Sequence, residues 1–161
     1  MSISTSMALA SEHGFALWAA QGRILQGWAD AQTGDATTGI ALIREGVAAD
    51  EAAGARVFTP FFLTLLAEAL AFAGKIQEGL ATLDNALAAS GVRGWDAEIH
   101  RLRGELAGRL PYPDPAKAED SFRAALAIAR EQGTRGYELR AATSLARLRL
   151  VRSPRASTPL I

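Results

Sequence analysis

Apolar residues recur at intervals of three and four along most of the chain, from Glu12 to Arg152. They form blocks of 15 to 20 residues, and short joints that contain glycine or proline separate the blocks. This spacing is typical of amphipathic helices, and no run of alternating β-branched residues predicts a strand. We expect an all-α protein with seven helices, at about 12–32, 36–53, 57–73, 76–90, 95–109, 115–132 and 135–151.

The joints carry ordinary helix-ending and helix-starting signals. Gly34 ends the first helix and Asp35 offers an N-cap to the second. Other glycines stand where a residue in the left-handed conformation belongs: Gly54, Gly74, Gly91 and Gly133. The segment 111–115, Pro-Tyr-Pro-Asp-Pro, predicts a stiff loop because proline excludes a continuous helix.

Small and large residues recur in two ladders with a unit of about 40 residues. The first ladder has a small, a large and a small residue in each unit: Gly39/Ile43/Gly46, Gly79/Leu83/Ala86 and Ala118/Phe122/Ala125. The second has a small residue 13 positions after each Gly-x-Arg: Ala67, Gly104 and Ala146. Small residues let paired helices approach closely, and a repeated unit of this length predicts stacked helix pairs.

The small, large, small pattern resembles the tetratricopeptide (TPR) repeat. The last third of the chain, with AEIHRLRGELAGRL and AEDSFRAALAIAREQGTRGYELRAATSLARLR, is similar to the C-terminal repeat region of large bacterial signalling proteins. Those proteins join a nucleotide cyclase or a LuxR-type output domain to a STAND-type ATPase module. The resemblance implies a right-handed α-solenoid of antiparallel helix pairs over residues 12–152, between disordered ends at 1–11 and 153–161. It also implies a non-catalytic protein–protein interaction scaffold with a sensory or regulatory role.

Composition narrows the class of protein. The 161 residues are 49% apolar and contain no cysteine, which excludes a disulfide framework and a thiolate metal site. We find neither an apolar run long enough for a membrane helix nor a secretory signal at 1–10, so we expect a single cytoplasmic domain with no membrane partner.

Motifs for catalysis are missing. The sequence has no phosphate-binding loop, dinucleotide fingerprint, nucleophile elbow or His-Glu-x-x-His motif. Asp96, Glu98 and His100 form the one acid and histidine group, and it fits an acidic first helical turn better than a metal site. We therefore expect no enzymatic activity, no cofactor and no metal.

Charge divides the chain into two halves. Residues 1–100 hold 5 basic and 11 acidic side chains, whereas residues 101–161 hold 12 basic and 6 acidic ones. Six arginines between 135 and 155 can form a solvated helix face, bind an acidic protein or bind nucleic acid. Nucleic-acid binding through this last helix is the alternative to the scaffold hypothesis, although no recognition motif accompanies the arginines.

The TPR resemblance also implies which side chains line a ligand groove. The concave face of such a repeat array is formed by the first helix of each pair. With Gly27, Ala67, Gly104 and Ala146 as equivalent small residues, the groove-facing set is Ile24, Trp28, Phe61, Thr64, Glu68, Glu98, Arg101, Glu105, Arg140 and Arg147. We expect this set to bind a protein or a peptide, unless the aromatic residues pack in the core and the charged residues pair with one another.

The last helix is apolar on more than one side, at Tyr137, Leu139, Ala142, Leu145, Ala146, Leu148 and Leu150. A terminal helix of a repeat array normally has a polar outer face. Two interpretations remain: another copy covers this helix in a homo-oligomer, or the helix is built to meet a further repeat.

Overall fold

The computed structural model describes residues 16–89, 91 and 93–152, and these residues form an all-α fold. Seven α-helices lie within the described ranges, with a short 3-10 helix η1 (Arg93–Trp95) before the fifth of them. The α-helices are α2 (Ala16–Thr33), α3 (Ala36–Ala52), α4 (Thr59–Phe72), α5 (Ile76–Ala89), α6 (Asp96–Ala107), α7 (Pro115–Glu131) and α8 (Arg135–Arg152). The predicted all-α class and the seven helices are confirmed, while the predicted disordered ends lie outside the described residues.

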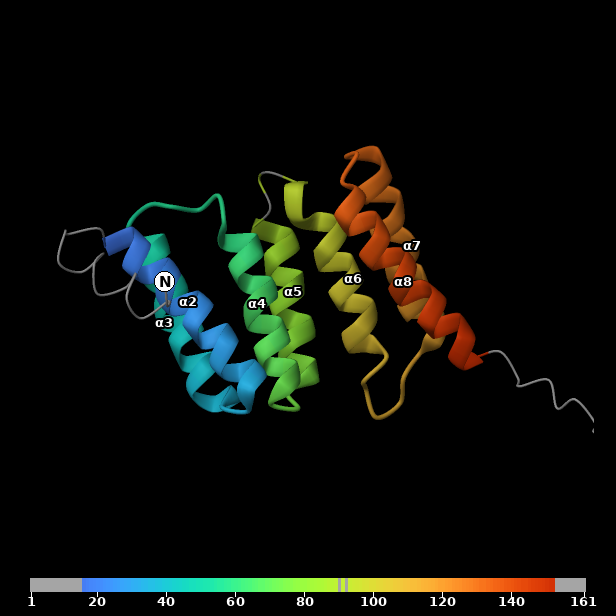
Figure 1. The fold of residues 1–161 in the computed structure, drawn as a ribbon, viewed down its shortest axis with the longest axis horizontal. Helices are drawn as coiled ribbons and strands as arrows, with labels where there is room; N and C mark the ends of the chain where they lie inside the picture. Colours follow the sequence, from blue (N-terminus) through green and yellow to red (C-terminus); the bar gives the residue numbers. More distant parts are fainter. Residues whose placement is uncertain (1–15, 90, 92, 153–161) are drawn as a thin grey trace, which may run out of the picture.

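Consecutive helices form antiparallel pairs that follow one another in chain order. The pairs are α2 with α3, α4 with α5, and α6 with α7, and α8 then packs against α7 and α6 (Figure 1). Three groups of buried apolar residues link the pairs, centred on Ile43, Leu83 and Phe122. Each pair therefore buries part of its apolar surface against the next one.

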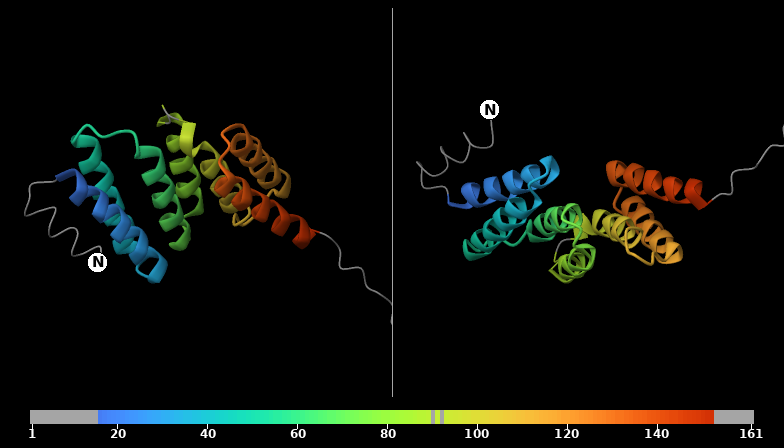
Figure 2. Two further views of the ribbon diagram at one scale, coloured as in Figure 1. Left: turned by 45° about the horizontal axis from the view of Figure 1, so that its top comes forward. Right: turned by 90° about the horizontal axis from the view of Figure 1, so that it is seen from below.

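The first helices of the pairs make a layer of their own. Helix α2 contacts α4, α4 contacts α6, and α6 contacts α8. Figure 2 shows α2 and α8 on the same side of an arc whose middle is formed by α4 and α6. Side chains from all four helices consequently face one concave surface.

Glycine allows the backbones of α2 and α3 to touch. A Cβ on Gly39 would overlap with the carbonyl oxygen of Gly27, and a Cβ on Gly27 would lie 2.5 Å from the carbonyl oxygen of Gly39. Real Cβ atoms do not approach other atoms this closely. At the matching point of the next pair, a Cβ on Gly79 would lie 3.2 Å from the carbonyl oxygen of Ala67.

The ladders predicted from the sequence correspond to these crossings. The large residues Ile43, Leu83 and Phe122 are all buried, and so are the small residues on either side of them. At the third crossing, Phe122 fills the space over Gly104, where a Cβ would lie 2.5 Å from the ring. Equivalent positions in the repeat thus have equivalent packing, as predicted.

The helix ends agree with the predicted signals. The Asp35 carboxylate accepts a hydrogen bond from the Thr38 backbone N–H at 3.1 Å and caps α3, and Asp114 caps α7 in the same manner. Four glycines at joints have a positive φ: Gly34, Gly54, Gly74 and Gly133. The joint at Gly91 borders residues 90 and 92, which lie outside the described part of the chain.

Helix α8 occupies the place of a first helix without a described second helix to cover it. Ala146 is exposed, whereas its equivalents Gly27, Ala67 and Gly104 are buried. Leu150 is 74% exposed, and a shallow depression of about 520 Å³, lined mostly by leucine and alanine side chains, runs along this side of α8. Self-association through this helix stays a prediction.

Candidate functional site

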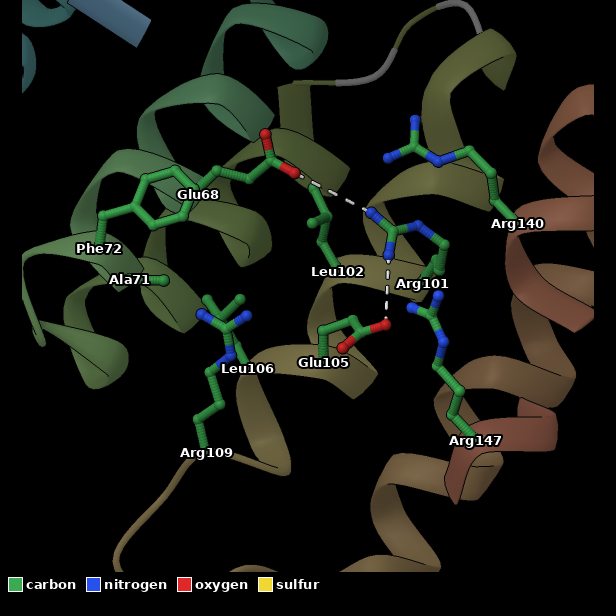
Figure 3. A pocket seen from close by; sticks show the side chains of 10 residues that line it. All are labelled: Glu68, Ala71, Phe72, Arg101, Leu102, Glu105, Leu106, Arg109, Arg140 and Arg147. Atoms are coloured by element: carbon green, nitrogen blue, oxygen red, sulfur yellow. Dashed lines mark hydrogen bonds and ion pairs between the residues drawn. The ribbon is translucent and has the colours of Figure 1, made fainter. Parts of the chain in front are cut away.

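The concave surface contains two adjoining hollows of about 270 and 280 Å³. We call the first the apolar hollow; it is lined by Leu25, Trp28, Phe61, Thr64, Leu65, Glu68, Glu98, Leu102 and Arg140. We call the second the arginine hollow; it is lined by Glu68, Ala71, Phe72, Arg101, Leu102, Glu105, Leu106, Arg109, Arg140 and Arg147 (Figure 3). They share Glu68, Leu102 and Arg140, and together they form the concave groove.

Nine residues of the predicted groove set line these hollows: Trp28, Phe61, Thr64, Glu68, Glu98, Arg101, Glu105, Arg140 and Arg147. They come from α2, α4, α6 and α8. Each lies one residue after, or three or six residues before, the small reference residue of its helix, which is Gly27, Ala67, Gly104 or Ala146. Such spacings share a helix face. The structure therefore brings these residues together, while their role in binding stays a prediction.

Ile24 is the exception, because its side chain is fully buried. It packs against Gly46 of α3, where a Cβ would lie 2.5 Å from Ile24 Cγ1. The next residue, Leu25, is 41% exposed and lines the apolar hollow instead. The prediction that Ile24 faces the groove is wrong, because one residue step turns a side chain about 100° around the helix.

Polar groups at the base of the apolar hollow are already hydrogen-bonded. The Trp28 indole N–H donates to Glu68 Oε2 at 2.8 Å and joins α2 to α4. The Thr64 hydroxyl donates to the Phe61 carbonyl oxygen of its own helix at 2.6 Å. What this hollow offers to a ligand is consequently apolar surface, from Leu25, Trp28 and Phe61.

Trp95 of η1 packs against Phe61, with ring centroids 4.8 Å apart. Phe58 and Phe62 extend the cluster, at 6.3 Å from Trp95 and 5.7 Å from Phe61 respectively. Aromatic rings at these separations stabilise one another beyond the area they bury. Phe61 therefore serves both as groove lining and as part of an aromatic cluster, so the two predicted alternatives for this residue both apply.

A buried ion network occupies the border between the hollows. Arg101 is 9% exposed and donates to both carboxylate oxygens of Glu98, at 2.7 and 3.0 Å. Glu105 lies 3.4 Å and Glu68 lies 4.0 Å from the same guanidinium group. Burial by itself would lower the pKa of Arg101, but the hydrogen bond and charge of Glu98, with the charges of Glu105 and Glu68, raise it above its ordinary value.

The same network reaches α8. Arg140 lies 2.9 Å from Glu98 Oε1, and the Ser144 hydroxyl donates to Glu105 Oε1 at 2.6 Å. With the Trp28–Glu68 bond, this connects all four helices of the concave layer. The pairing of Arg101 with Glu105, which the sequence left open as an alternative to ligand binding, is present.

Sequence reasoning missed three exposed groove residues: Leu25, Phe72 and Arg109. Phe72 follows Glu68 by four positions, and Arg109 follows Glu105 by four. Continuing the groove face by one helical turn would have found both of them.

No protein-family model matches the chain. In an alignment of 153 positions that covers 92% of the chain, it is 31% identical to an uncharacterized protein of Rhizobium meliloti (strain 1021). The match covers 15% of that protein, so the chain spans a small fraction of this curated relative.

His100 has no cluster of possible metal ligands around it among the described residues. Its imidazole is half-buried, and burial lowers its pKa, as does the charge of Arg103, against the opposite effect of Asp96. Within residues 16–89, 91 and 93–152, no three histidine, aspartate or glutamate side chains lie close enough together to hold a metal ion. In the same ranges, no helix is both long and apolar enough to cross a membrane.

Several arginines of the last helix are paired within the chain. Arg140 pairs with Glu98, whereas Arg149 and Arg152 lie 2.9 and 2.8 Å from the Glu119 carboxylate of α7. Arg123 approaches Glu119 at 2.9 Å as well. The hydrogen bond from Arg149, together with the charges of the three arginines, lowers the pKa of Glu119 below its ordinary value of 4.5.

We expect Glu119→Gln to reduce the acid sensitivity of the fold. A carboxylate whose folded-state pKa is lowered stabilises the fold above its unfolded-state pKa, and this contribution is lost as the pH falls through the folded-state value. The variant should melt below the wild-type protein at neutral pH, and the difference should shrink as the pH falls below 4.5. Melting followed by circular dichroism at several pH values measures this, with Asp120→Asn as the matched control. A difference that stays constant with pH would contradict the assignment.

Proposed function

We propose that the chain is a non-catalytic, TPR-type interaction module that binds a segment of a protein partner in its concave groove. The observation that carries the proposal is the groove itself, to which α2, α4, α6 and α8 contribute exposed apolar and charged side chains. Ligand sites combine apolar surface with a few placed polar groups in this way.

A regulatory role in a bacterial signalling protein is part of the same proposal. The support is the similarity of the last third of the chain to the C-terminal repeats of such proteins, together with the far greater length of the Rhizobium relative. A module of this kind binds a partner or a neighbouring domain and restrains or releases an output domain.

Nucleic-acid binding receives less support as an alternative. Of the five arginines of α8 that the structure describes, Arg140, Arg149 and Arg152 have carboxylate partners within the chain. Paired arginines contribute little to the counterion release that drives binding to a phosphate backbone.

A capture experiment tests the interaction function. The full chain serves as bait in a lysate of its own organism, and retained proteins are identified by mass spectrometry. The groove variant Leu25→Ser/Phe72→Ser removes two exposed apolar side chains, and the control Leu139→Ser removes a leucine that is 69% exposed and lies outside the groove. We expect the wild type and the control to retain the same partner and the groove variant to lose it, because exposed apolar anchors carry much of the energy of such interfaces.

Retention of the same partner by all three proteins would contradict binding in the groove. Retention of nucleic acid that disappears at high salt would favour the alternative function.

A further inference from the structure

Four arginines line the arginine hollow, and they fall into two classes. Arg101 and Arg140 are held by Glu98, with Glu105 also beside Arg101. In contrast, Arg109 and Arg147 are exposed and have no carboxylate partner among the described residues. Figure 3 shows both lining the hollow on either side of Glu105, Arg147 from α8 and Arg109 from the turn after α6.

Neither glutamate that lines the hollow forms an ion pair with Arg109 or Arg147. Glu68 accepts the Trp28 indole hydrogen bond and faces Arg101, and Glu105 accepts the Ser144 hydroxyl and faces Arg101 as well. Both carboxylates are thus engaged in the network. Arg109 and Arg147 consequently line the hollow as exposed guanidinium groups without a carboxylate partner among the described residues, and Leu102 and Leu106 line it as well.

We propose that the partner segment is an acidic peptide whose carboxylates pair with Arg109 and Arg147 while an apolar side chain enters the apolar hollow. This inference rests on the proposed function and names the chemistry of its ligand. Arginine presents several N–H donors in a plane and binds carboxylates with two parallel hydrogen bonds. In a concave site with apolar walls, such a pair is screened less by solvent than on an open surface.

Polar and apolar features of the groove favour a peptide over a nucleic acid. A peptide offers carboxylates and an aliphatic or aromatic side chain on the same short segment, which matches the neighbouring hollows. A nucleic-acid strand carries a phosphate at every nucleotide and needs a longer track of free cations. Beyond the hollow, α8 offers little such track because Arg149 and Arg152 are held by Glu119.

Selection from a random-peptide phage library tests the proposal with the full chain as target. We expect enrichment of aspartate and glutamate in the selected peptides. A parallel selection uses Arg109→Gln/Arg147→Gln, and we expect it to lose the acidic preference. The control is Arg135→Gln, which removes an exposed arginine of α8 that does not line the groove; it should select the same acidic peptides as the wild type.

A titration with one selected peptide then measures the contribution of each arginine. We expect Arg109→Gln and Arg147→Gln each to weaken binding about fivefold to tenfold, and high salt to weaken binding to the wild type, because charge-assisted pairs at a rim contribute modestly and are screened. Melting curves of the variants should match the wild type, since neither arginine has a carboxylate partner within residues 16–89, 91 and 93–152.

The possible outcomes distinguish a failure of the acidic-ligand proposal from a failure of the proposed interaction function. Selected peptides without an acidic preference, or an acidic preference that survives in Arg109→Gln/Arg147→Gln, would overturn the acidic-ligand proposal and leave the interaction function standing. A short single-stranded DNA that displaces the selected peptide and binds more tightly would also overturn it. Failure of the wild type to select any peptide would count against the proposed function itself.

Discussion

Gly39→Ala is expected to destabilise the protein by about 2–3 kcal/mol, because the added methyl group forces α2 and α3 apart. The new Cβ would overlap with the Gly27 carbonyl oxygen and lie 2.9 Å from both the Cβ and the backbone nitrogen of Ala31. Two of these atoms belong to the backbone of α2, so no side-chain rotation can relieve the overlap. The gain in helix propensity on replacing glycine, about 1 kcal/mol, offsets only part of this cost.

Gly136→Ala is the matched control for that prediction. Gly136 also lies inside an α-helix, but a Cβ there would meet nothing within 4 Å. We expect this variant to be slightly more stable than the wild type, by about 0.5 kcal/mol, because alanine loses less backbone entropy on folding. Urea unfolding of both variants measures the two free energies. A Gly39→Ala protein as stable as Gly136→Ala would show that the α2–α3 backbone contact is absent.

Arg101→Met is expected to lower the free energy of unfolding by about 3–5 kcal/mol, because it breaks a buried ion pair by removing one partner. The substitution leaves the Glu98 carboxylate, 8% exposed, without its two hydrogen bonds from Arg101. Methionine fills a similar volume but cannot donate a hydrogen bond. Arg140 still reaches Glu98 but is 53% exposed, and so compensates only in part.

Arg103→Met supplies the control for Arg101→Met on the same helix. Arg103 pairs with Asp84 at 2.8 Å, and its side chain is 40% exposed. Exposed ion pairs contribute about 0–1 kcal/mol to stability, so the free energy of unfolding of this variant should remain close to that of the wild type. The double variant Glu98→Met/Arg101→Met should recover part of the stability lost in Arg101→Met, because it removes the carboxylate that was left without donors. Strictly additive losses in chemical unfolding would contradict the coupling between Glu98 and Arg101.

The ion network and the free arginines divide the groove into structural and ligand-facing charges. Arg101 stabilises the fold, and its removal would affect any partner indirectly by disturbing the concave layer. Arg109 and Arg147 have no such partner in the part of the chain that the structure describes. Experiments on the proposed ligand should therefore change these two residues and leave Arg101 in place.

Local and repeated features of the chain were predicted from the sequence alone. The apolar spacing of three and four placed the helices, and their observed bounds agree within a few residues over the described ranges. The ladder of small and large residues predicted the crossings at Gly39, Gly79 and Ala118, because such contacts depend on side-chain size at fixed helical positions. The same periodicity, with the TPR register, placed nine residues on one concave face.

Tertiary structure alone decided which side chains are free. The sequence contains many arginines and acidic residues. Only the packing of α6 against α4 and α8 shows that Arg101 is surrounded by carboxylates, whereas Arg147 has no carboxylate partner among the described residues. It also assigned Leu25 instead of Ile24 to the groove, and it brought Trp95 onto Phe61 across 34 positions of sequence. Helix periodicity specifies the direction in which a side chain leaves its own helix axis. Burial and ion pairing depend in addition on the distances between neighbouring helices, and these distances are set only when the helices pack.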